Sequence, residues 1–227
     1  MHLALIMDGN RRWARKRNLS TLEGYQAGVS ALRRVVSAAA ARSVRTLTVF
    51  GFSTENWKRE RAEVHDLMRL CAQAARMELW PLVREGIKVR LLGDTASLPQ
   101  FTQHALEALV WNTARNRGLT LQLALNYSGR AEIVHAARAL ARDVAASQLM
   151  PDAIDERALR ARFFLPGMPD PDLLVRTGGD FRVSNFLLYQ LAYTEFFTTP
   201  VLWPDFGAAE LDAILDGFTL RRRRFGT

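Results

Sequence analysis

The feature that most restricts the fold of this sequence is a regular alternation of two apolar patterns. Short apolar stretches typical of buried strands occupy residues 2–7, 45–52, 88–93, 119–126 and 172–176. Apolar residues recur every three or four positions, as in helices, over 28–42, 60–85, 98–116 and 129–146. Parallel strands need crossover connections, and helical crossovers cover the faces of the sheet. The alternation therefore predicts an α/β fold with a central, mostly parallel sheet flanked by helices.

Nothing in the sequence divides this pattern into parts. It contains no internal repeat, low-complexity tract or Gly/Ser/Pro-rich linker, so we expect a single domain over residues 1–227. No apolar run approaches the roughly 20 residues needed to span a bilayer, and the first apolar stretch precedes the positive charges, the reverse of a secretory signal. Cys71 is the only cysteine, which excludes an internal disulfide. These features predict a cytoplasmic protein.

The charge balance points to an anionic partner. The net charge is +8 and comes mostly from arginine, whose planar fork suits phosphate oxygens. Nucleic acid, an anionic membrane surface and a small molecule carrying diphosphate all fit this charge. The positions of the arginines therefore have to decide among them.

Polar clusters that contain arginine follow four of the predicted strands. They read MDGNRRW (7–13), GFSTENWKR (51–59), NYSGR (126–130) and RTGGDFRVSN (176–185). Ligands of open α/β sheets bind beyond the carboxyl ends of the strands, so we expect one anion-binding site on this rim. The arginines lie beside carboxylates rather than along an exposed basic stripe, which argues against a nucleic-acid-binding module.

Asp8 has two interpretations. It either caps the following helix or supplies a carboxylate to a magnesium ion that bridges phosphates held by Arg11 and Arg12. Gly9 would let the backbone approach such a ligand closely. Aspartyl phosphatases want a second aspartate two residues on, where this chain has Asn10, and neither a P-loop nor a dinucleotide fingerprint occurs.

The later clusters also leave alternatives open. Arg176, Arg182 and Ser184 surround two glycines and form either a solvated loop or a second phosphate cradle, which would imply two diphosphates. Trp57 is either a core anchor or a lid over an apolar ligand, and for Phe50 and Phe52 we favour the core. The four histidines show no metal-binding spacing.

Together these motifs resemble the cis-prenyltransferases, the family that includes undecaprenyl diphosphate synthase. The resemblance runs from about residue 2 to residue 226 and rests on MDGNRRWA, FSTENWKR, LNYSGR, PDPDLLVRTGG, RVSNFLLYQLAYTEF and VLWPDF. It implies a homodimeric, Mg²⁺-dependent enzyme that condenses isopentenyl diphosphate with an allylic diphosphate, such as farnesyl or geranyl diphosphate, into a Z-polyprenyl diphosphate. It further implies an apolar tunnel between sheet and helices, peripheral membrane contact for product release, and no nucleic acid.

The resemblance also implies roles for individual residues. Asp8 would be the essential carboxylate and a metal ligand, Glu195 a second carboxylate tied to the metal, and Asn56 would assist removal of the proton from the isopentenyl unit. Trp13 would lie near the prenyl chain. The residues implied in substrate binding are Gly9, Asn10, Arg11, Arg12, Trp13, Tyr25, Ser53, Thr54, Glu55, Trp57, Arg59, Arg176, Arg182, Val183, Ser184, Arg224 and Gly226. The terminal motif RFG would complete the site across the subunit boundary.

The chain departs from the family pattern at three positions. Tyr25 replaces the usual histidine, Thr21 replaces a phosphate-contacting arginine, and Asp180 stands where glutamate is common. The first two changes weaken the allylic diphosphate site unless Arg11, Arg15 or Arg17 compensates. They leave room for a divergent member with an unusual short starter or product in specialised metabolism.

Two further points concern the tunnel for the prenyl chain and the possibility that the protein is not itself an enzyme. Gly51 suggests an open tunnel and a longer product. The tunnel wall would come from residues 60–85, where Leu67, Leu70, Cys71 and Ala74 form a stripe that ordinary core packing explains equally well. A non-catalytic partner subunit that lends its C-terminal arginines is an alternative to the enzyme. Such relatives tend to lose the early aspartate, which this chain keeps.

Overall fold

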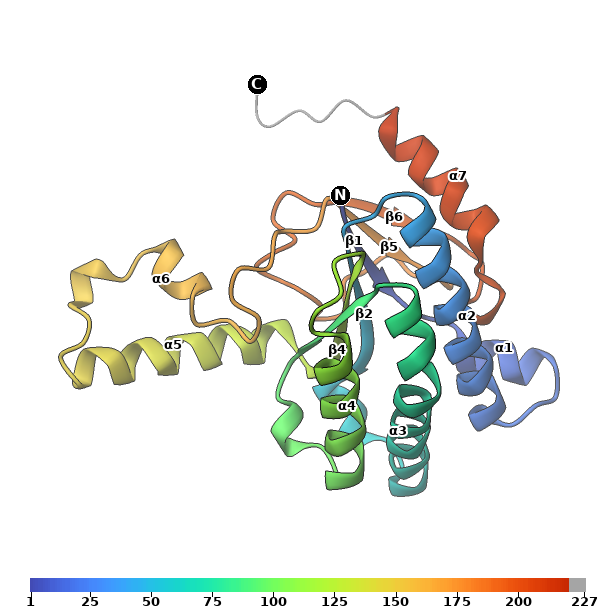
Figure 1. Cartoon of the computed structure of the whole chain (residues 1–227), viewed down its shortest axis with the longest axis horizontal. Helices are drawn as coiled ribbons and strands as arrows, with labels where there is room; N and C mark the ends of the chain where they lie inside the picture. The colour runs from blue at the N-terminus through green and yellow to red at the C-terminus, as the bar shows by residue number, and fades with distance from the viewer. Residues whose placement is uncertain (221–227) are drawn as a thin grey trace.

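A computed structural model describes residues 1–220 and shows a six-stranded parallel sheet with helices packed on it (Figure 1). The strands are β1 (His2–Ile6), β2 (Thr46–Ser53), β3 (Lys88–Leu92), β4 (Thr120–Tyr127), β5 (Leu173–Arg176) and β6 (Glu195–Thr198). Their order in the sheet is β3-β4-β2-β1-β5-β6. The predicted α/β class is therefore confirmed, and β6 is an additional strand that the sequence patterns missed.

Seven α-helices connect or flank the strands within residues 1–220. They are α1 (Asn10–Lys16), α2 (Thr21–Ala41), α3 (Arg61–Arg84), α4 (Gln100–Thr113), α5 (Gly129–Ala145), α6 (Glu156–Arg160) and α7 (Ala208–Thr219). No helix in this part of the chain is long and apolar enough to cross a membrane. Prediction missed α6 and α7 and started α2 too late. That helix begins at Thr21 because Ser20 and Glu23 form a capping box.

The two faces of the sheet bury two separate groups of side chains. Leu3 and Leu5 of β1 point into the larger core, which α2, α3, α4 and α7 cover. Ala4 and Ile6 point into a smaller core that includes Phe186 from the segment after β5. This division follows from the two-residue side-chain period of a strand.

The arrangement of the helices leaves one end of the sheet accessible. Figure 1 shows α2, α3 and α4 side by side, while α5 projects from the body and α6 lies along it. All six strands are parallel, so the segments that follow β1, β2, β4 and β5 emerge at the same edge.

Trp203 joins the end of the sheet where β1, β2, β4 and β5 finish to the helical layer. Its side chain is 1% exposed, its indole N–H donates to the Gly28 carbonyl of α2 at 2.8 Å, and its ring stacks on Phe206. Its backbone N–H donates to the Asp8 carbonyl at 3.0 Å. One buried aromatic residue therefore connects the segment after β6, helix α2 and the segment after β1.

We expect Trp203→Ala to lower the free energy of unfolding by about 3–5 kcal/mol, because it removes a large buried side chain and leaves a cavity. Chemical denaturation would measure the change. The matched control is Trp111→Ala, at a residue that is 83% exposed and for which a change within about 0.5 kcal/mol is expected. Equal effects of the two substitutions would contradict the fastening role.

Candidate functional site

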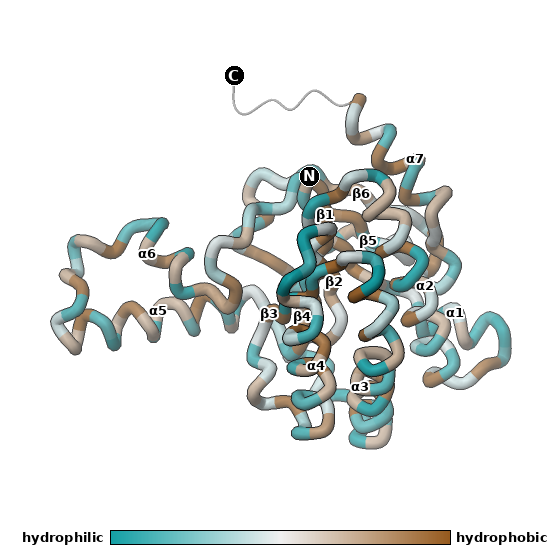
Figure 2. Tube along the Cα trace, viewed as in Figure 1, coloured by the Kyte–Doolittle hydropathy of each residue, from teal (hydrophilic) through white to brown (hydrophobic). Residues whose placement is uncertain are grey.

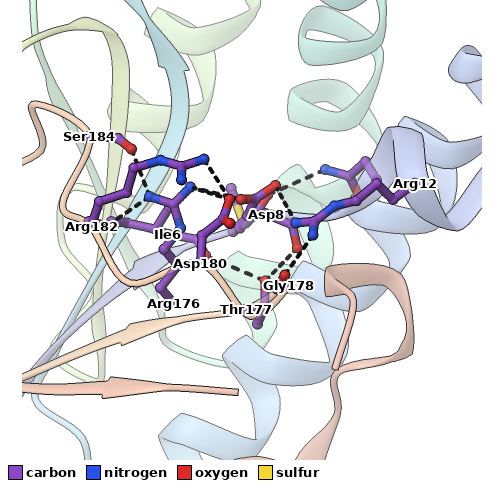
Figure 3. A network of polar contacts seen from close by, with 11 residues as sticks. Ile6, Asp8, Arg12, Arg176, Thr177, Gly178, Asp180, Arg182 and Ser184 are labelled. Carbon is purple, nitrogen blue, oxygen red and sulfur yellow. Dashed lines mark hydrogen bonds and ion pairs between the residues drawn. The ribbon is translucent and has the colours of Figure 1, made fainter. Parts of the chain in front are cut away.

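The site is organised around contacts between Asp8 and Arg176 (Figure 3). Arg176 ends β5 and lies opposite Ile6 of β1, which places its guanidinium beside the residue that follows β1. Its Nη2 donates to Asp8 Oδ2 at 2.8 Å, and its Nη1 donates to the Ser184 hydroxyl and the Arg182 carbonyl, each at 2.7 Å. The first and the last of the four predicted clusters therefore meet.

Arg12 holds the other oxygen of the Asp8 carboxylate. Its Nη2 lies 3.1 Å from Asp8 Oδ1, and its Nη1 donates to the Gly178 carbonyl at 2.6 Å. Figure 3 shows Asp8 between Arg12 on one side and Arg176 and Arg182 on the other. The N-cap residue of α1 is Gly9, and no side chain caps this helix, so the capping interpretation of Asp8 is wrong.

The two guanidinium groups keep Asp8 ionised. Burial raises the pKa of this carboxyl, but the hydrogen bond from Arg176 and the charges of Arg12 and Arg176 lower it by more, so the net pKa lies below its ordinary value. Arg176 is itself only 4% exposed. A guanidinium this deep is stable only beside compensating negative charge.

A cavity of about 810 Å³ opens beside this pair. Three of the four predicted clusters contribute sequence-predicted residues to its wall, namely Asp8, Asn10, Ser53, Glu55, Asn56, Arg59, Arg176, Arg182, Val183 and Ser184, together with Tyr25 of α2. The NYSGR cluster contributes Arg130. All four clusters therefore face one space, as their positions after parallel strands predict.

A second, mainly apolar cavity of about 190 Å³ adjoins the first, since Met7, Asn10, Tyr25, Gly51 and Leu67 line both. Its wall includes the residues predicted from the stripe on α3, which are Leu67, Leu70, Cys71 and Ala74. It lies between β2 and β4 of the sheet and helices α2 and α3. This position matches the expected tunnel.

Charged side chains line the apolar cavity away from its opening. Tyr25 and Leu67 mark the opening, and Arg33 and Glu78 lie 8 and 11 residues further along α2 and α3, or about 12 and 16 Å at the helical rise. Arg33 Nε lies 3.4 Å from Glu78 Oε2, and Arg33 also pairs with Glu85. The passage between the helices thus has an ion pair in its far wall.

The turn after β2 presents Asn56. Its Oδ1 accepts the Ser53 backbone N–H at 3.0 Å, which fixes the amide on the cavity wall. The indole N–H of Trp57 donates to Asn126 Oδ1 at 2.8 Å, so Trp57 is anchored at the rim and 39% exposed. Phe52 is buried in the core as expected, and Phe50 packs on Phe186.

Tyr25, which replaces the usual histidine, binds the guanidinium of Arg59. Arg59 Nη1 donates to the Tyr25 hydroxyl at 2.6 Å, and that hydroxyl donates to Glu63 at 2.7 Å. Burial and the Glu63 hydrogen bond raise the pKa of Tyr25 to about 12, so the phenol is neutral. Arg17 is not the compensating cation, because it pairs with Asp205 at 3.2 Å.

Several predicted residues do not reach the cavity wall. Trp13 donates its indole N–H to Asp205 at 2.6 Å and lies under Arg17. Arg12 contacts Asp8 without lining the cavity. The other predicted residues absent from the described walls of both cavities are Gly9, Arg11, Thr54 and Trp57. Arg224 and Gly226 lie outside the described residues.

Glu195 lies toward the opposite end of the sheet. It begins β6 opposite Leu173, and Leu173 is opposite Leu3 of β1. Five residues of strand, about 16 Å, separate that level from Asp8. Within one chain Glu195 therefore lies too far from Asp8 to bind the same metal ion, and its role as a carboxylate tied to the metal stays a prediction.

Sequence reasoning missed several contributors to the network. Thr177 Oγ1 donates to the Asp8 carbonyl at 2.7 Å, and Asp180 accepts from Arg182 at 2.5 Å and from Arg176 at 3.4 Å. The available signal was the glycine pair at 178 and 179. Both glycines adopt a positive φ, which directs the loop back over Asp8.

The site has the chemistry of an anion site that can also hold a metal. The Nε of Arg176 and Oδ1 of Asn10 are buried without a hydrogen-bond partner among residues 1–220. No group of three or more metal-ligating side chains occurs in the same range. An ionised aspartate beside this polar cavity fits Mg²⁺, which typically binds one or two carboxylates plus substrate phosphates.

Comparison with known proteins agrees with the motifs. A family model described as putative undecaprenyl diphosphate synthase matches residues 6–226. An isoprenyl transferase of Brucella abortus is 48% identical over 225 residues, covering 99% of this chain and 89% of the relative. A ditrans,polycis-undecaprenyl-diphosphate synthase of Xanthomonas axonopodis, described as (2E,6E)-farnesyl-diphosphate specific, is 46% identical over 225 residues, covering 99% and 88%.

Two solved structures share the whole fold. Lavandulyl diphosphate synthase from Lavandula x intermedia, in complex with dimethylallyl diphosphate, has a TM-score of 0.96 at 38% identity and covers 100% of this chain and 98% of its own. A probable undecaprenyl diphosphate synthase from Campylobacter jejuni has a TM-score of 0.82 at 29% identity, with the same coverage. The resemblance inferred from the motifs is therefore confirmed.

Gly178→Ala should weaken pyrophosphate binding about tenfold, because a Cβ there would lie 2.3 Å from Arg12 Nη2 and displace the guanidinium. Isothermal titration calorimetry with inorganic pyrophosphate measures the change. Gly179→Ala is the matched control, since its φ is nearly the same but its nearest neighbour is Pro200 Cα at 3.7 Å. An equal loss in both variants would show that backbone strain, not Arg12, is responsible.

Arg176→Gln should raise the pKa of Asp8, and Arg12→Gln should raise it less, because Arg176 contributes both the larger hydrogen-bond effect and a charge. Carbon-detected NMR titration of the Asp8 carboxyl measures both shifts. Because the folded pKa is depressed, ionised Asp8 stabilises the wild type above its unfolded pKa, and this is lost as pH falls through the folded pKa. An unchanged Asp8 pKa in both variants would refute the assignment.

Proposed function

This chain belongs to the undecaprenyl diphosphate synthase family of prenyltransferases, and we propose that it condenses isopentenyl diphosphate with an allylic diphosphate to form a Z-polyprenyl diphosphate. The observation that carries the proposal is the pair of adjoining cavities, one polar and lined by arginine, the other apolar. A diphosphate head with an isoprenoid tail has the same two parts. Each part of the substrate finds a matching environment.

Two groups of polar side chains, each containing arginine, support two diphosphates. Arg12 and Asn10 lie on the α1 side of Asp8 and would hold the allylic diphosphate. Arg176, Arg182 and Ser184 lie on the other side and would hold isopentenyl diphosphate. Both groups adjoin Asp8, so the substrates would meet with their charged heads side by side.

The main requirement of the reaction is stabilisation of the diphosphate that leaves the allylic substrate. Condensation forms a carbon–carbon bond, breaks the bond between the allylic carbon and its diphosphate, and removes one proton from the isopentenyl unit. Arginine hydrogen bonds directed at the departing diphosphate stabilise the charge that develops there. Mg²⁺ held by Asp8 and phosphate oxygens would supply further neutralisation of that charge.

Asn56 would act on the isopentenyl unit. Its side-chain oxygen is held by the Ser53 N–H, so its NH₂ group stays at a fixed place on the wall of the polar cavity. In this position Asn56 would orient the diphosphate or the unit that loses the proton. An amide cannot itself accept the proton at neutral pH, so its role is positioning.

The apolar cavity would hold the tail of the allylic substrate. Its walls come from β2, β4 and the inner faces of α2 and α3. Burial of methylene groups there would add binding energy for each isoprenoid unit. The tail would thus point from Asp8 toward Arg33 and Glu78.

A second candidate function, use of a short allylic starter, rests on three observations. The apolar cavity measures only about 190 Å³, and the lavandulyl enzyme, whose structure holds dimethylallyl diphosphate, superposes with a TM-score of 0.96. Tyr25 with Arg59 in place of the usual histidine also changes the wall that the two cavities share.

We further propose that the protein is a cytoplasmic homodimer. The β6 strand is an edge of the sheet. Phe181, 78% exposed, packs on Phe196 of β6, and Tyr193 before that strand is 83% exposed. Exposed aromatic side chains at a sheet edge favour covering by a second copy. A single cysteine, Cys71, whose pKa burial raises to about 11, suits a reducing compartment.

Labelled isopentenyl diphosphate should be incorporated when dimethylallyl, geranyl or farnesyl diphosphate is supplied with Mg²⁺, and chromatography of the products identifies the preferred starter and the product length. Asp8→Ala should reduce turnover at least about 100-fold, because it removes the proposed metal ligand and unbalances two arginines. Asp8→Asn keeps the shape and should lose activity similarly, with circular dichroism confirming the fold. Full turnover by either variant would refute the metal role, and no incorporation with any starter would refute the function.

A further inference from the structure

The turn that carries Asn56 is held mainly by polar contacts. This 3₁₀ turn, η1 (Thr54–Lys58), follows β2 and leads into α3, and none of its residues is buried. The elements on either side are anchored in the core, since Phe52 of β2 is 3% exposed and α3 buries Val64 and Met68. Figure 2 shows the hydrophobic residues of α3 interleaved with hydrophilic ones. A segment with few buried apolar contacts depends on its hydrogen bonds for a fixed position.

Two asparagines hold the residues on either side of Asn56. Glu55 Oε1 accepts a hydrogen bond from the side-chain NH₂ group of Asn185 at 2.7 Å. On the other side, the Trp57 indole N–H donates to Asn126 Oδ1 at 2.8 Å. The neighbours of Asn56 in the chain are therefore tied to the end of β4 and to the segment after β5.

Both asparagines have a left-handed backbone and are themselves fixed. The φ angle is +47° at Asn126 and +65° at Asn185, a conformation that asparagine adopts more readily than most other residues with a side chain. Asn126 Nδ2 donates to the Asp94 carbonyl at 2.8 Å. The Asn185 side-chain oxygen accepts the Arg130 N–H at 3.0 Å, and its carbonyl accepts the Gly129 N–H at 2.7 Å. Backbone groups thus orient each amide that holds the turn.

Asn185 lies in the same loop as residues proposed to hold isopentenyl diphosphate. Ser184 immediately precedes it, accepts a hydrogen bond from Arg176 and also has a positive φ, 48°. Left-handed residues other than glycine persist only where the surrounding contacts determine them, and they cluster at functional sites. The wall of the polar cavity includes Glu55, Asn56, Ser184 and Asn185. One side-chain hydrogen bond therefore links two parts of this wall.

The hydrogen bond between Asn185 and Glu55 has an ionised acceptor. Burial raises the pKa of the Glu55 carboxyl, but hydrogen bonds lower it by more, and the bond from Asn185 makes the largest of these contributions. The carboxylate is therefore charged at neutral pH. Hydrogen bonds to ionised acceptors are stronger than those between neutral groups, so this contact holds the turn better than a pair of neutral amides would.

We propose that Asn185 is a positioning residue that, through Glu55, sets where Asn56 lies relative to the bound isopentenyl diphosphate. The inference rests on the proposed function, which states what Asn56 acts on. The diphosphate and the carbon that loses the proton belong to one small substrate, so the two parts of the wall must stand at a matching separation. A displacement of about 1 Å in such an arrangement can cost about 100-fold in rate.

The test compares Asn185→Gly with Asn185→Asp. Both substitutions keep the left-handed backbone accessible, but the first removes the amide and the second places a carboxylate against Glu55. We expect the rate of the first condensation, measured in a single turnover at saturating isopentenyl diphosphate, to fall about 10- to 100-fold in each variant. The half-saturating concentration should change much less, because Arg182 and Ser184 remain.

Reversing the polarity of the bond should restore the rate. In Asn185→Asp/Glu55→Gln the new amide donates to the new carboxylate, so a charge-assisted bond again links the two parts of the wall. Glu55→Gln alone keeps an acceptor for the Asn185 amide and should lose little. The matched control is Asn18→Asp, at an exposed asparagine with φ 56° that lies outside the described wall of the polar cavity. It should leave the rate unchanged.

A second readout does not require turnover. In the wild type the side-chain amide of Asn56 should give one sharp pair of ¹H–¹⁵N NMR signals, because the turn is held on both sides. These signals should broaden in Asn185→Gly and remain sharp in Asn185→Asp/Glu55→Gln. The side-chain signals of Asn112, which bonds within α4 to the Ala108 carbonyl, should stay unchanged in all variants.

Three outcomes would overturn the proposal. They are an unchanged single-turnover rate in both Asn185 variants, a loss confined to the half-saturating concentration, and a double variant without recovery, which would assign the loss to the contact with Arg130. A wild type that incorporates no isopentenyl diphosphate, but whose Asn56 signals respond as expected, would refute the proposed function while sustaining the placement of Asn56 by Asn185. Normal turnover with unresponsive signals would do the reverse.

Discussion

The structure depends on the pairing of Arg176 with Asp8. The Arg176 side chain lies almost wholly inside the molecule at the end of β5, where a guanidinium is tolerated only beside negative charge. The pair fastens the segments after β1 and β5 to each other and orders the loop that carries Arg182 and Ser184. The contacts that order this loop therefore also place Arg176 and Arg182 beside Asp8. The Asp8 carboxylate is held ionised by the arginines that stabilise the loop.

The site divides into a polar part and an apolar part. Charged groups come mainly from segments that leave the strands, whereas the apolar cavity lies between the strands β2 and β4 and the helices that pack on them. Met7, Tyr25 and Gly51 belong to both walls, so the two spaces meet where strands end and helices begin. The reacting carbon of a substrate would lie at this boundary, between a charged head and a buried tail.

The sequence predicted the parts of the molecule that follow from local patterns. Five strands and the meeting of four clusters were predictable, because apolar periodicity identifies parallel strands and parallel strands share an edge. The short strand β6 and helix α7 carry weaker patterns and depend on tertiary packing. The contact of Trp13 with Asp205 was not predictable, because it joins residues 192 positions apart. The level of Glu195 on the sheet was not predictable either, because strand register cannot be obtained from one sequence.

The ion pair of Arg33 with Glu78 lies in the far wall of the apolar cavity. A tail that grew this far would have to strip water from both groups, at a free-energy cost of several kcal/mol per ion, while each added methylene contributes about 0.8 kcal/mol. Elongation would then stop where the cost of desolvating the ion pair exceeds the gain from burying more of the tail, and no closed wall would be needed. The length of the product would then follow from the balance of these two free energies.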